Sequence, residues 1–506
     1  MKYYLGIDNG GTATKAALYT AQGEEVGVAS ISTGALVPRP GFVERDMEQM
    51  WQDNCHVIKK LLKETGADAA DIACIACCGH GKGLYLWGKD GKPAYQGILS
   101  ADTRATAYAT KWKADGTLAR VYDRTLQSVM ACQPVALLAW LKEHDPAVLE
   151  RAQWIFACKD YIRFCLTEEA YAEITDFSGC NLMNLRTGGY DKEILEAFGI
   201  AELYDRLPPL KGSAELCGTV SASAAAQTGL MEGTPVAGGM FDIDACALAV
   251  GVTDEEHMCM IAGTWSINEY IRRQPVTDGS VLMNSLFCMP GYYLVEESSP
   301  TSAGNAEWFI NTLLSELRKE AEESGKSIYD ITNDWVVSVP PEEFCPLFAP
   351  FLMASSVHPD ARAFFMGITG YHTRAHLMRS VYEGVAFCHR YHYDKLMRNR
   401  RPPESIRLAG GVARSREWVQ IFADVMDCPI EVVEVNETGA LGSAIAATVA
   451  AGEYPDLQTA VQAMTRMARR VEPQTVYREI YGKKYALYCR LLEALDPVWT
   501  DMKQLY

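Results

Sequence analysis

The chain has 506 residues, of which 48% are hydrophobic and 22% are charged, a composition ordinary for a globular protein. Its 64 acidic and 47 basic residues give a net charge of -17, which argues against nonspecific binding to nucleic acid or anionic membranes. A small anionic ligand stays compatible with this charge, because a local site can oppose the global sign. The length exceeds one typical core and predicts two domains or lobes.

No targeting or membrane segment is expected. Asp8 interrupts the first apolar run before a signal peptide could form, and no apolar run is long enough to span a bilayer. We therefore expect a cytoplasmic protein with no membrane partner. The 16 cysteines lie in core-like segments and are expected to be buried thiols. Cys74, Cys77 and Cys78 lack a second metal-binding pair at zinc spacing, so no metal is expected there.

The segment "LGIDNGGTATKAALY", residues 5–19, delivers an aspartate from an apolar run and then becomes rich in small residues. Small residues allow backbone N–H groups to approach an anion, and Lys15 adds positive charge. Asp8 is suited to hold a divalent cation. The alternative is an ordinary β-turn, since Asn-Gly is a common hairpin signal. This stretch alone does not decide between the two interpretations.

The remaining elements follow in chain order. Alternation and helical spacing predict strands at 1–8, 16–23, 24–32 and 71–87, a helix at 46–66 and further helices at 133–149 and 159–169. Residues 234–252 read as a strand, a glycine turn and a helix of small residues.

A repeat links the two halves of the chain. Gly11-Thr12-Ala13-Thr14 is echoed by Gly263-Thr264-Trp265-Ser266, and "VAGGMFDIDACALAVG" is echoed by "LAGGVARSREWVQIFADV". The shared order predicts duplicated α/β lobes with a boundary near 251–256, and glycine turns that hold one polyphosphate from both sides of a cleft. Met260 stands at the equivalent of Asp8, so a metal is expected only in the first lobe.

The run "AFFMGITGYHTRAHLMRSVYE", residues 363–383, resembles the C-terminal signature of the FGGY family of carbohydrate kinases. "PVALLAWLKEH" resembles a second signature in Pro134 and Trp140, although Leu137 stands where a lysine is usual. The resemblance covers nearly the whole chain. It implies an α/β fold of two duplicated ribonuclease-H-like, actin-like ATPase lobes with an interlobe cleft, here residues 1–252 and 253–506.

The resemblance also implies roles for individual residues. Asp242 stands at the family's general base, with Asp244 as its rival and a helix N-cap as the alternative reading. Asp8 is expected to hold Mg²⁺, partly through water. The residues expected to bind ATP are Gly11, Thr12, Lys15, Gly263, Thr264, Gly410, Gly411 and Ser415. Lys15 is equally compatible with a side chain that points to solvent, and no Walker A motif is present.

The sugar site is expected in the first lobe. Its predicted residues are His80, Gly81, Lys82, Asp102 and Asp242. His80 to Leu84 occupy the place of the Gln-Met-His-Gly-Leu run of D-xylulose kinases, and this departure argues against D-xylulose. Lys82 is expected to bind hydroxyls or a carboxylate, with a solvated turn lysine as the alternative.

We therefore predict an ATP-dependent kinase that phosphorylates a terminal hydroxyl of a ketopentose. L-xylulose is the expected substrate, because residues 296–309 resemble the corresponding run of L-xylulose kinases. The alternatives are 3-keto-L-gulonate, D-xylulose, ribulose or a polyol, and, from another class, a non-catalytic sugar sensor or an ATPase on the same fold. The expected partners are the sugar and ATP, with a homodimer as the assembly considered.

Overall fold

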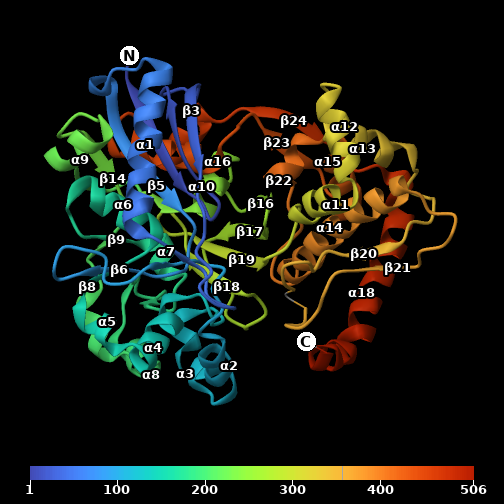
Figure 1. Ribbon diagram of the computed structural model, residues 1–506, viewed down its shortest axis with the longest axis horizontal. Helices are drawn as coiled ribbons and strands as arrows, with labels where there is room; N and C mark the ends of the chain where they lie inside the picture. Colours follow the sequence, from blue (N-terminus) through green and yellow to red (C-terminus); the bar gives the residue numbers. More distant parts are fainter. Residues whose placement is uncertain (356, 506) are drawn as a thin grey trace. The chain divides into compact units, whose positions relative to one another are not determined.

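The computed structural model describes residues 1–355 and 357–505 and has two compact units (Figure 1). Each unit is assembled from three chain segments. Unit 1 comprises Met1–Thr253, Ile271–Val295 and Val435–Arg466, and unit 2 comprises Asp254–Tyr270, Glu296–Glu434 and Met467–Tyr506. The chain first passes from unit 1 to unit 2 between Thr253 and Asp254, and later segments return to unit 1. The division into residues 1–252 and 253–506 stays a prediction. No helix in the described parts of the chain is long and apolar enough to cross a membrane.

Unit 1 is built on a seven-stranded sheet with the strand order β13-β14-β5-β1-β2-β3, in which β15 also pairs with β5. Its strands are β1 (Tyr3–Asn9), β2 (Ala13–Tyr19), β3 (Glu25–Ser32), β5 (Ile72–Gly79), β13 (Leu216–Thr219), β14 (Pro235–Ala237) and β15 (Met240–Phe241). The first three strands form the predicted antiparallel meander, whereas β5 runs parallel to β1, β14 and β15. Parallel strands bring their carboxyl ends to one edge of the sheet.

Helices cover both faces of this sheet. Leu5 and Ile7 of β1 enter the core beneath α1 (Met47–Thr65) and α6 (Cys158–Thr167). Gly6 faces the opposite way, because successive side chains alternate between faces. There it meets α16 (Thr438–Ala450) so closely that a Cβ atom on Gly6 would lie 1.9 Å from the Ala440 carbonyl oxygen. Asp8 therefore shares the α16 face, and α10 (Asp242–Ala249) packs against α16.

Unit 1 also contains a second hydrophobic core, which includes Trp112 and Trp140. The remaining helices of unit 1 are α2 (Thr106–Ala114), α3 (Thr117–Thr125), α4 (Pro134–His144), α5 (Pro146–Arg151), α7 (Ile174–Ser178), α8 (Lys192–Ala197), α9 (Ala222–Thr228) and α17 (Leu457–Met464). Its two-stranded pairs are β4 (Glu44–Arg45) with β7 (Gly97–Ile98), β6 (Tyr85–Gly88) with β8 (Ala152–Phe156), β9 (Ala172–Glu173) with β12 (Leu210–Lys211), and β10 (Met183–Asn184) with β11 (Gly189–Tyr190).

The second seven-stranded sheet has the order β18-β19-β17-β16-β22-β23-β24. Its strands are β16 (His257–Ala262), β17 (Ser266–Arg272), β18 (Met283–Leu286), β19 (Tyr293–Ser299), β22 (Ser405–Ala409), β23 (Ile430–Val433) and β24 (Met467–Val471). The run β22-β16-β17-β19 repeats β5-β1-β2-β3: in each, two strands pair in antiparallel fashion through a Gly-Thr turn and the first also pairs with a parallel strand. The predicted α/β fold with duplicated lobes is confirmed. The predicted interlobe cleft stays a prediction.

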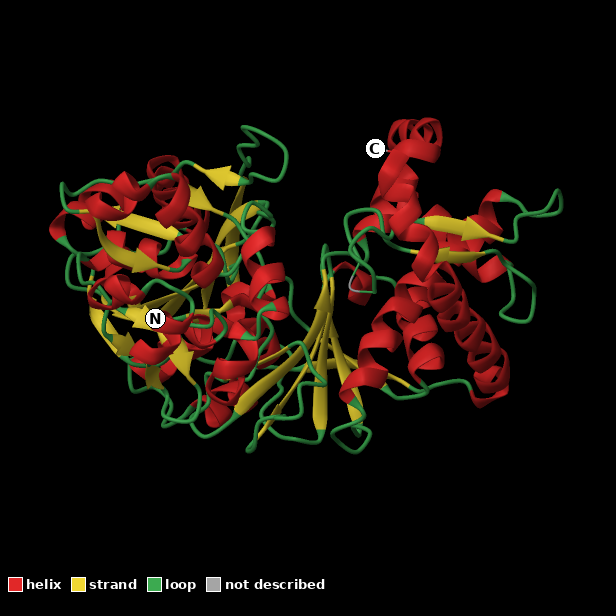
Figure 2. Cartoon of the chain, turned by 90° about the horizontal axis from the view of Figure 1, so that it is seen from below, coloured by secondary structure: helices red, strands yellow, loops and turns green. Residues whose placement is uncertain are grey.

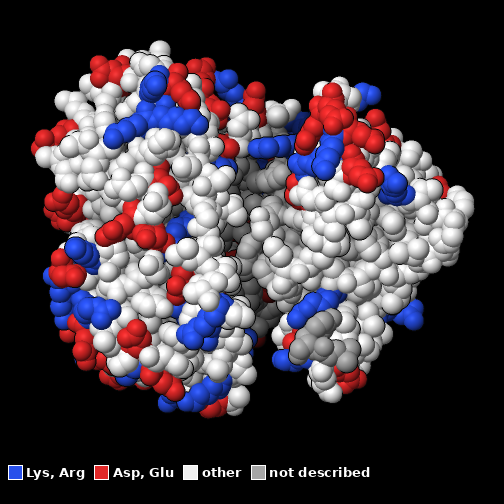
Figure 3. All heavy atoms as spheres, in the orientation of Figure 1, with Lys and Arg blue, Asp and Glu red and all other residues white. Residues whose placement is uncertain are grey.

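The helices of unit 2 are drawn red in Figure 2, as are all helices, and strands are yellow. The unit 2 helices are α11 (Gly304–Leu313), α12 (Ser315–Glu323), α13 (Ile328–Ser338), α14 (Arg374–Leu396), α15 (Arg416–Met426) and α18 (Arg478–Met502), beside the pair β20 (Leu347–Ala349) and β21 (Phe364–Met366). Short 3₁₀ turns complete the chain at Ala69–Asp71, Ala201–Arg206, Gly411–Arg414, Thr475–Tyr477 and Lys503–Leu505. Acidic side chains gather over α12 on the face shown in Figure 3.

Candidate active site

Three parallel strands of unit 1 end beside one another. Strands β1 and β15 both pair with β5, so that Asp8 of β1 and Met240 of β15 lie on either side of Cys78. Ligand sites in open α/β sheets form at such carboxyl ends. The chain leaves these ends through the Gly10–Gly11 turn, through residues 79–83 and through Asp242, so the structure gathers most of the site residues predicted in the first lobe.

Asp8 lies beside the first turn of α16. A Cβ atom on Gly439 would be 2.6 Å from the Asp8 carboxylate, so any larger residue there would displace that carboxylate. Burial raises the pKa of Asp8, and the neighbouring Lys15 ammonium opposes that rise. Lys15 faces Asp8 across the β1–β2 register and forms an ion pair with Glu437 at 2.5 Å. The solvent-pointing alternative for Lys15 does not describe this arrangement.

Asp242 is the first residue of α10, and no side chain caps that helix. Its N-cap alternative is therefore not what the structure contains. Burial raises the pKa of Asp242 well above its usual range, and the carboxylates of Asp8 and Asp176 raise it further. The Lys82 ammonium opposes these effects. A carboxyl group among other carboxylates in a desolvated place is suited to accept a proton.

Asp244 has a different environment. Its Oδ1 accepts the backbone N–H of Cys288 at 3.1 Å, and Glu173 is the neighbouring charge that raises its pKa most, after burial. Two residues along an α-helix turn the side chain by about 200°, so Asp242 and Asp244 leave the helix on opposite sides. This arrangement favours Asp242 as the group that faces Asp8.

The loop after β5 is fully enclosed. His80 is buried and its Nε2 lies 2.7 Å from the Tyr85 hydroxyl; burial lowers the pKa of His80 to about 4, with a further contribution from Arg45. A Cβ atom on Gly81 would lie 2.1 Å from the Phe241 ring, so only glycine fits there.

Lys82 occupies the left-handed backbone region with a φ of 62°. Its N–H donates to Asp176 Oδ1 at 3.3 Å, and its ammonium lies 5.6 Å from the centre of the Phe241 ring. Only 6% of Lys82 is exposed, so the interpretation of a solvated turn lysine is wrong.

Asp102 is engaged in an ion-pair network. Arg104 donates to both of its carboxylate oxygens, and the backbone N–H of Val43 donates to Oδ2 at 2.7 Å. Arg104 also pairs with Glu44 at 2.7 Å. Contact between Asp102 and a substrate stays a prediction. The observed bonds by themselves show that Asp102 stabilises the local fold.

In unit 2, two predicted nucleotide-binding turns lie against each other. Gly263 and Thr264 link β16 to β17, while Gly410 follows β22, which is parallel to β16. Gly410 has a φ of 87°, and a Cβ atom there would lie 2.6 Å from the Ala262 carbonyl oxygen. Gly411 beside it is exposed.

Ser415 lies after these turns and caps α15. Its hydroxyl accepts the N–H of Trp418 at 3.1 Å and donates to Asn333 at 3.0 Å. A contact between Ser415 and a nucleotide stays a prediction.

Sequence reasoning missed a buried charge cluster that includes Asp176, the acceptor of the Lys82 N–H. Lys159 Nζ lies within 3.3 to 3.4 Å of carboxylates of Asp160, Glu173 and Asp176. Burial raises the pKa of Asp176 to about 6, although Lys159 opposes the rise. The available signal was "KDYIR" in an amphipathic helix, where charges fall on the side that packs inward.

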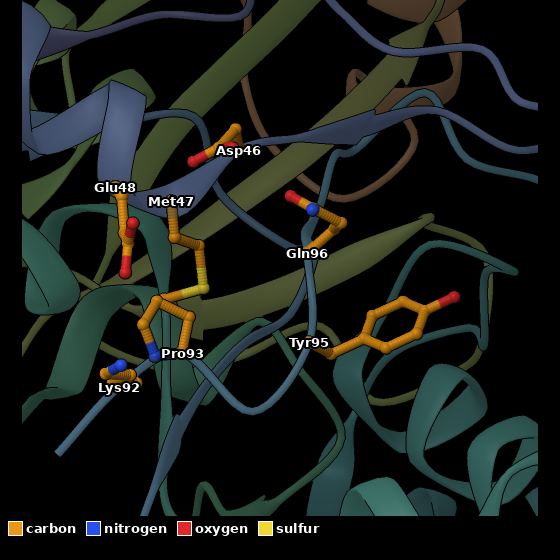
Figure 4. Close-up of a pocket in the computed structure, with 7 residues that line it drawn as sticks. All are labelled: Asp46, Met47, Glu48, Lys92, Pro93, Tyr95 and Gln96. Carbon is orange, nitrogen blue, oxygen red and sulfur yellow. The ribbon is translucent and has the colours of Figure 1, made fainter. Parts of the chain in front are cut away.

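A separate pocket of about 460 Å³ opens at the start of α1 (Figure 4). Its lining residues are Asp46, Met47, Glu48, Lys92, Pro93, Tyr95 and Gln96. None of them is a predicted site residue, and Asp46 already caps α1 by accepting the Gln49 N–H.

A divalent cation such as Mg²⁺ needs oxygen ligands that converge on one point. Among residues 1–355 and 357–505, no group of three or more His, Cys, Asp or Glu side chains is arranged to hold a metal. Mg²⁺ usually takes one or two protein carboxylates and completes its shell with water and phosphate oxygens. Asp8, with its neighbour Asp242, fits a cation of that kind arriving with a nucleotide.

Known proteins resemble this chain over nearly its whole length. Residues 3–249 match the N-terminal domain, and residues 258–451 the C-terminal domain, of the FGGY family of carbohydrate kinases. The chain is 37% identical to the L-xylulose/3-keto-L-gulonate kinase of Escherichia coli over 99% of each chain. It is 34% identical to a probable L-xylulose kinase of Haemophilus influenzae over 98% of this chain and 99% of the relative.

Solved structures show the same fold. The ligand-bound xylulose kinase from Lactobacillus acidophilus superposes with a TM-score of 0.89 at 24% identity, covering 99% of this chain and 100% of that one. The Plasmodium falciparum glycerol kinase with ADP gives a TM-score of 0.83 at 19% identity, covering 97% of this chain and 98% of that one.

Proposed function

We propose that this chain, which belongs to the FGGY family of carbohydrate kinases, transfers the γ-phosphoryl group of ATP to a terminal hydroxyl of a ketopentose. Members of this family use ATP, typically with Mg²⁺. The observation that carries the proposal for this chain is the gathering of Asp8, Asp242 and Lys82 at the carboxyl ends of three parallel strands.

Asp242 acts as the general base in this proposal. The sugar hydroxyl gives its proton to the Asp242 carboxylate while its oxygen attacks the γ-phosphorus, and the bond from that phosphorus to the bridging oxygen breaks to release ADP. The raised pKa of Asp242 makes it a better proton acceptor than an ordinary surface carboxylate. The enclosed loop around Lys82 excludes water, which would otherwise compete as acceptor.

Asp8 would hold the Mg²⁺ ion, which neutralises charge on the phosphates when bound. The Gly11–Thr12 turn would donate to the same phosphates, and Lys15 would add positive charge. The first lobe, predicted as residues 1–252, would supply these groups and the sugar site. The second lobe supplies Gly263, Thr264, Gly410, Gly411 and Ser415 for the nucleotide.

The proposed substrate is L-xylulose. Support comes from two relatives at 37% and 34% identity, of which the first is named an L-xylulose kinase and the second a probable L-xylulose kinase. One of them is also named a 3-keto-L-gulonate kinase, and the buried Lys82 ammonium offers a partner for the carboxylate of such a keto-acid. That compound is therefore the second candidate. His80, Gly81 and Asp102 complete the proposed sugar site.

The test is ADP release, coupled to an optical readout, with L-xylulose, D-xylulose, L-ribulose, glycerol and 3-keto-L-gulonate as acceptors. We expect kcat/KM to be highest for L-xylulose. A clear preference for glycerol or D-xylulose would contradict the proposed substrate but not the proposed kinase activity. ADP release that no acceptor accelerates would instead identify an ATPase, and binding of sugar without turnover would identify a sensor. A homodimer and a cytoplasmic location stay predictions.

A further inference from the structure

Strand β4 places a buried arginine against the first glycine turn. Arg45 is only 3% exposed, and its Nη1 and Nη2 donate to the carbonyl oxygens of Gly10 and Gly11 at 3.2 and 2.6 Å. The turn between β1 and β2 consists of Gly10, Gly11 and Thr12. One planar guanidinium therefore holds two successive peptide units of this turn.

These two bonds fix the direction of the N–H groups in the turn. A trans peptide unit is planar, and its C=O and N–H bonds point in opposite directions. Because the carbonyls of Gly10 and Gly11 face Arg45, the N–H groups of Gly11 and Thr12 face away from it. Both residues are exposed, and in the described parts of the chain neither N–H has a backbone acceptor. The turn thus presents two free donors to an anion.

The charge of Arg45 is not neutralised by a neighbour. Among the described residues no carboxylate lies within ion-pair distance of its guanidinium, and its Nε is buried without a hydrogen-bond partner. Its positive charge also contributes to the lowered pKa of His80. A buried cation without a counter-charge is unfavourable, and an anion bound nearby would offset that cost.

The strand that carries Arg45 is held from its other side. Glu44 accepts from Arg104 at 2.7 Å and from the Tyr95 hydroxyl at 3.1 Å, and Arg104 in turn holds Asp102. Strand β4 also pairs with β7. Arg45 is thereby fixed independently of the glycine turn that it contacts, which a positioning role requires.

We propose that Arg45 is a positioning residue that holds the Gly10–Gly11 turn with its N–H groups toward the phosphates of ATP and supplies an uncompensated positive charge behind them. The inference rests on the proposed kinase function. Asp102 helps to fix β4 in position, because it binds Arg104, which in turn binds Glu44. Arg45 itself touches neither the sugar nor the reacting atoms.

The experiment compares the full-length wild type with Arg45→Gln, Arg45→Lys and Arg206→Gln. Calorimetry measures the Kd of Mg-ADP, steady-state kinetics gives KM for ATP and for the sugar, and thermal melting reports folding. Arg206 is the matched control, since it is half-buried and donates to the Leu149 carbonyl oxygen away from the turn.

For Arg45→Gln we expect Kd for Mg-ADP and KM for ATP to rise about 10- to 100-fold, the usual effect of losing hydrogen bonds to a charged group. KM for the sugar should change much less. Arg45→Lys should recover part of the loss, because a lysine restores charge but cannot bridge both carbonyls. Arg206→Gln should lower the melting temperature without changing either constant.

An unchanged Mg-ADP Kd in a folded Arg45→Gln variant would overturn the proposal, and so would equal losses for sugar and nucleotide. If Arg45→Gln does not fold, Arg45→Lys decides by the same two constants. A wild type that binds Mg-ADP but phosphorylates no sugar would contradict the proposed function alone. A wild type that binds no nucleotide would contradict both.

Discussion

Asp242 and Asp244 lie two residues apart at the start of one helix, yet their carboxylates belong to different surroundings. Asp242 shares its environment with Asp8, Asp176 and Lys82, whereas Asp244 accepts the backbone N–H of Cys288 inside the fold. Helical geometry separates the two side chains, and this separation gives distinct expectations for the two variants.

Asp242→Ala is expected to lower kcat by about 10²- to 10⁴-fold, the contribution of a positioned acid–base group. The Kd of Mg-ADP should stay near the wild-type value, because the glycine turns are unchanged. Asp244→Ala should keep much more activity per folded molecule while losing stability, since it leaves the Cys288 N–H without its acceptor. Normal turnover by Asp242→Ala beside an inactive, folded Asp244→Ala would reverse the assignment.

Asp8→Ala is expected to raise the Mg²⁺ concentration needed for half-maximal activity by about 10- to 100-fold, as for residues that hold a metal through water. Sugar binding without nucleotide should change little. The measurement is a Mg²⁺ titration of the rate at fixed ATP. Asp46→Ala serves as control: removing the cap of α1 costs stability of about 1 kcal/mol but leaves the Mg²⁺ dependence unchanged.

Lys82→Met should distinguish the two candidate substrates. Loss of the buried ammonium is expected to lower kcat/KM for 3-keto-L-gulonate by about 10- to 100-fold, because a hydrogen-bonded carboxylate loses its partner. The neutral ketose should lose less. Lys142→Met, which removes a surface ion pair with Glu202, controls for charge alone. Equal losses for both substrates would show that Lys82 does not recognise a carboxylate.

His80 predicts a pH dependence of stability. Burial lowers its pKa to about 4, so the folded state holds it neutral while the unfolded state, with a pKa near 6.5, takes up a proton. The free energy of unfolding should therefore fall as the pH is lowered from about 6.5 to 4, by up to about 3 kcal/mol from this group. His80→Gln should flatten that slope in denaturant titrations at several pH values. An identical slope in the variant would show that His80 does not titrate as described.

Local patterns were sufficient to predict β1, β3, the helix 47–65 and the glycine turns, because each depends on near neighbours in the chain. The single strand predicted at 71–87 is wrong, since β5 ends at Gly79 and β6 begins at Tyr85. The helix predicted at 133–149 is likewise interrupted between α4 and α5. Asp8 was singled out from the apolar run that contains it, whereas the role of Asp242 was implied by the family resemblance. The pairing of β15 with β5 then places Asp242 near Asp8. This proximity depends on strand pairing and could not be predicted from the sequence.

Two features depend on long-range contacts and were not predictable from spacing. Lys159 of α6 meets Glu173 of β9 and Asp176 of α7 only in the folded chain, and a sequence alone presents these residues as ordinary surface charges. Arg45 meets Gly10 across 35 residues, through a two-stranded pairing too short to leave a periodic signal. Buried charges of this kind can be identified only when the three-dimensional positions of their partners are known.

The helix α16 packs on β1 with the Ala440 carbonyl against Gly6, although 434 residues separate them in the chain. Asp8 likewise lies beside Gly439. A ribosome that has released only residues 1–434 has therefore produced a sheet with one face uncovered, and its Asp8 still lacks its neighbouring helix. The last part of unit 1 is made after most of unit 2, so the surroundings of Asp8 are completed late in synthesis. Until then, the apolar α16 face of the sheet is a surface for chaperones to protect.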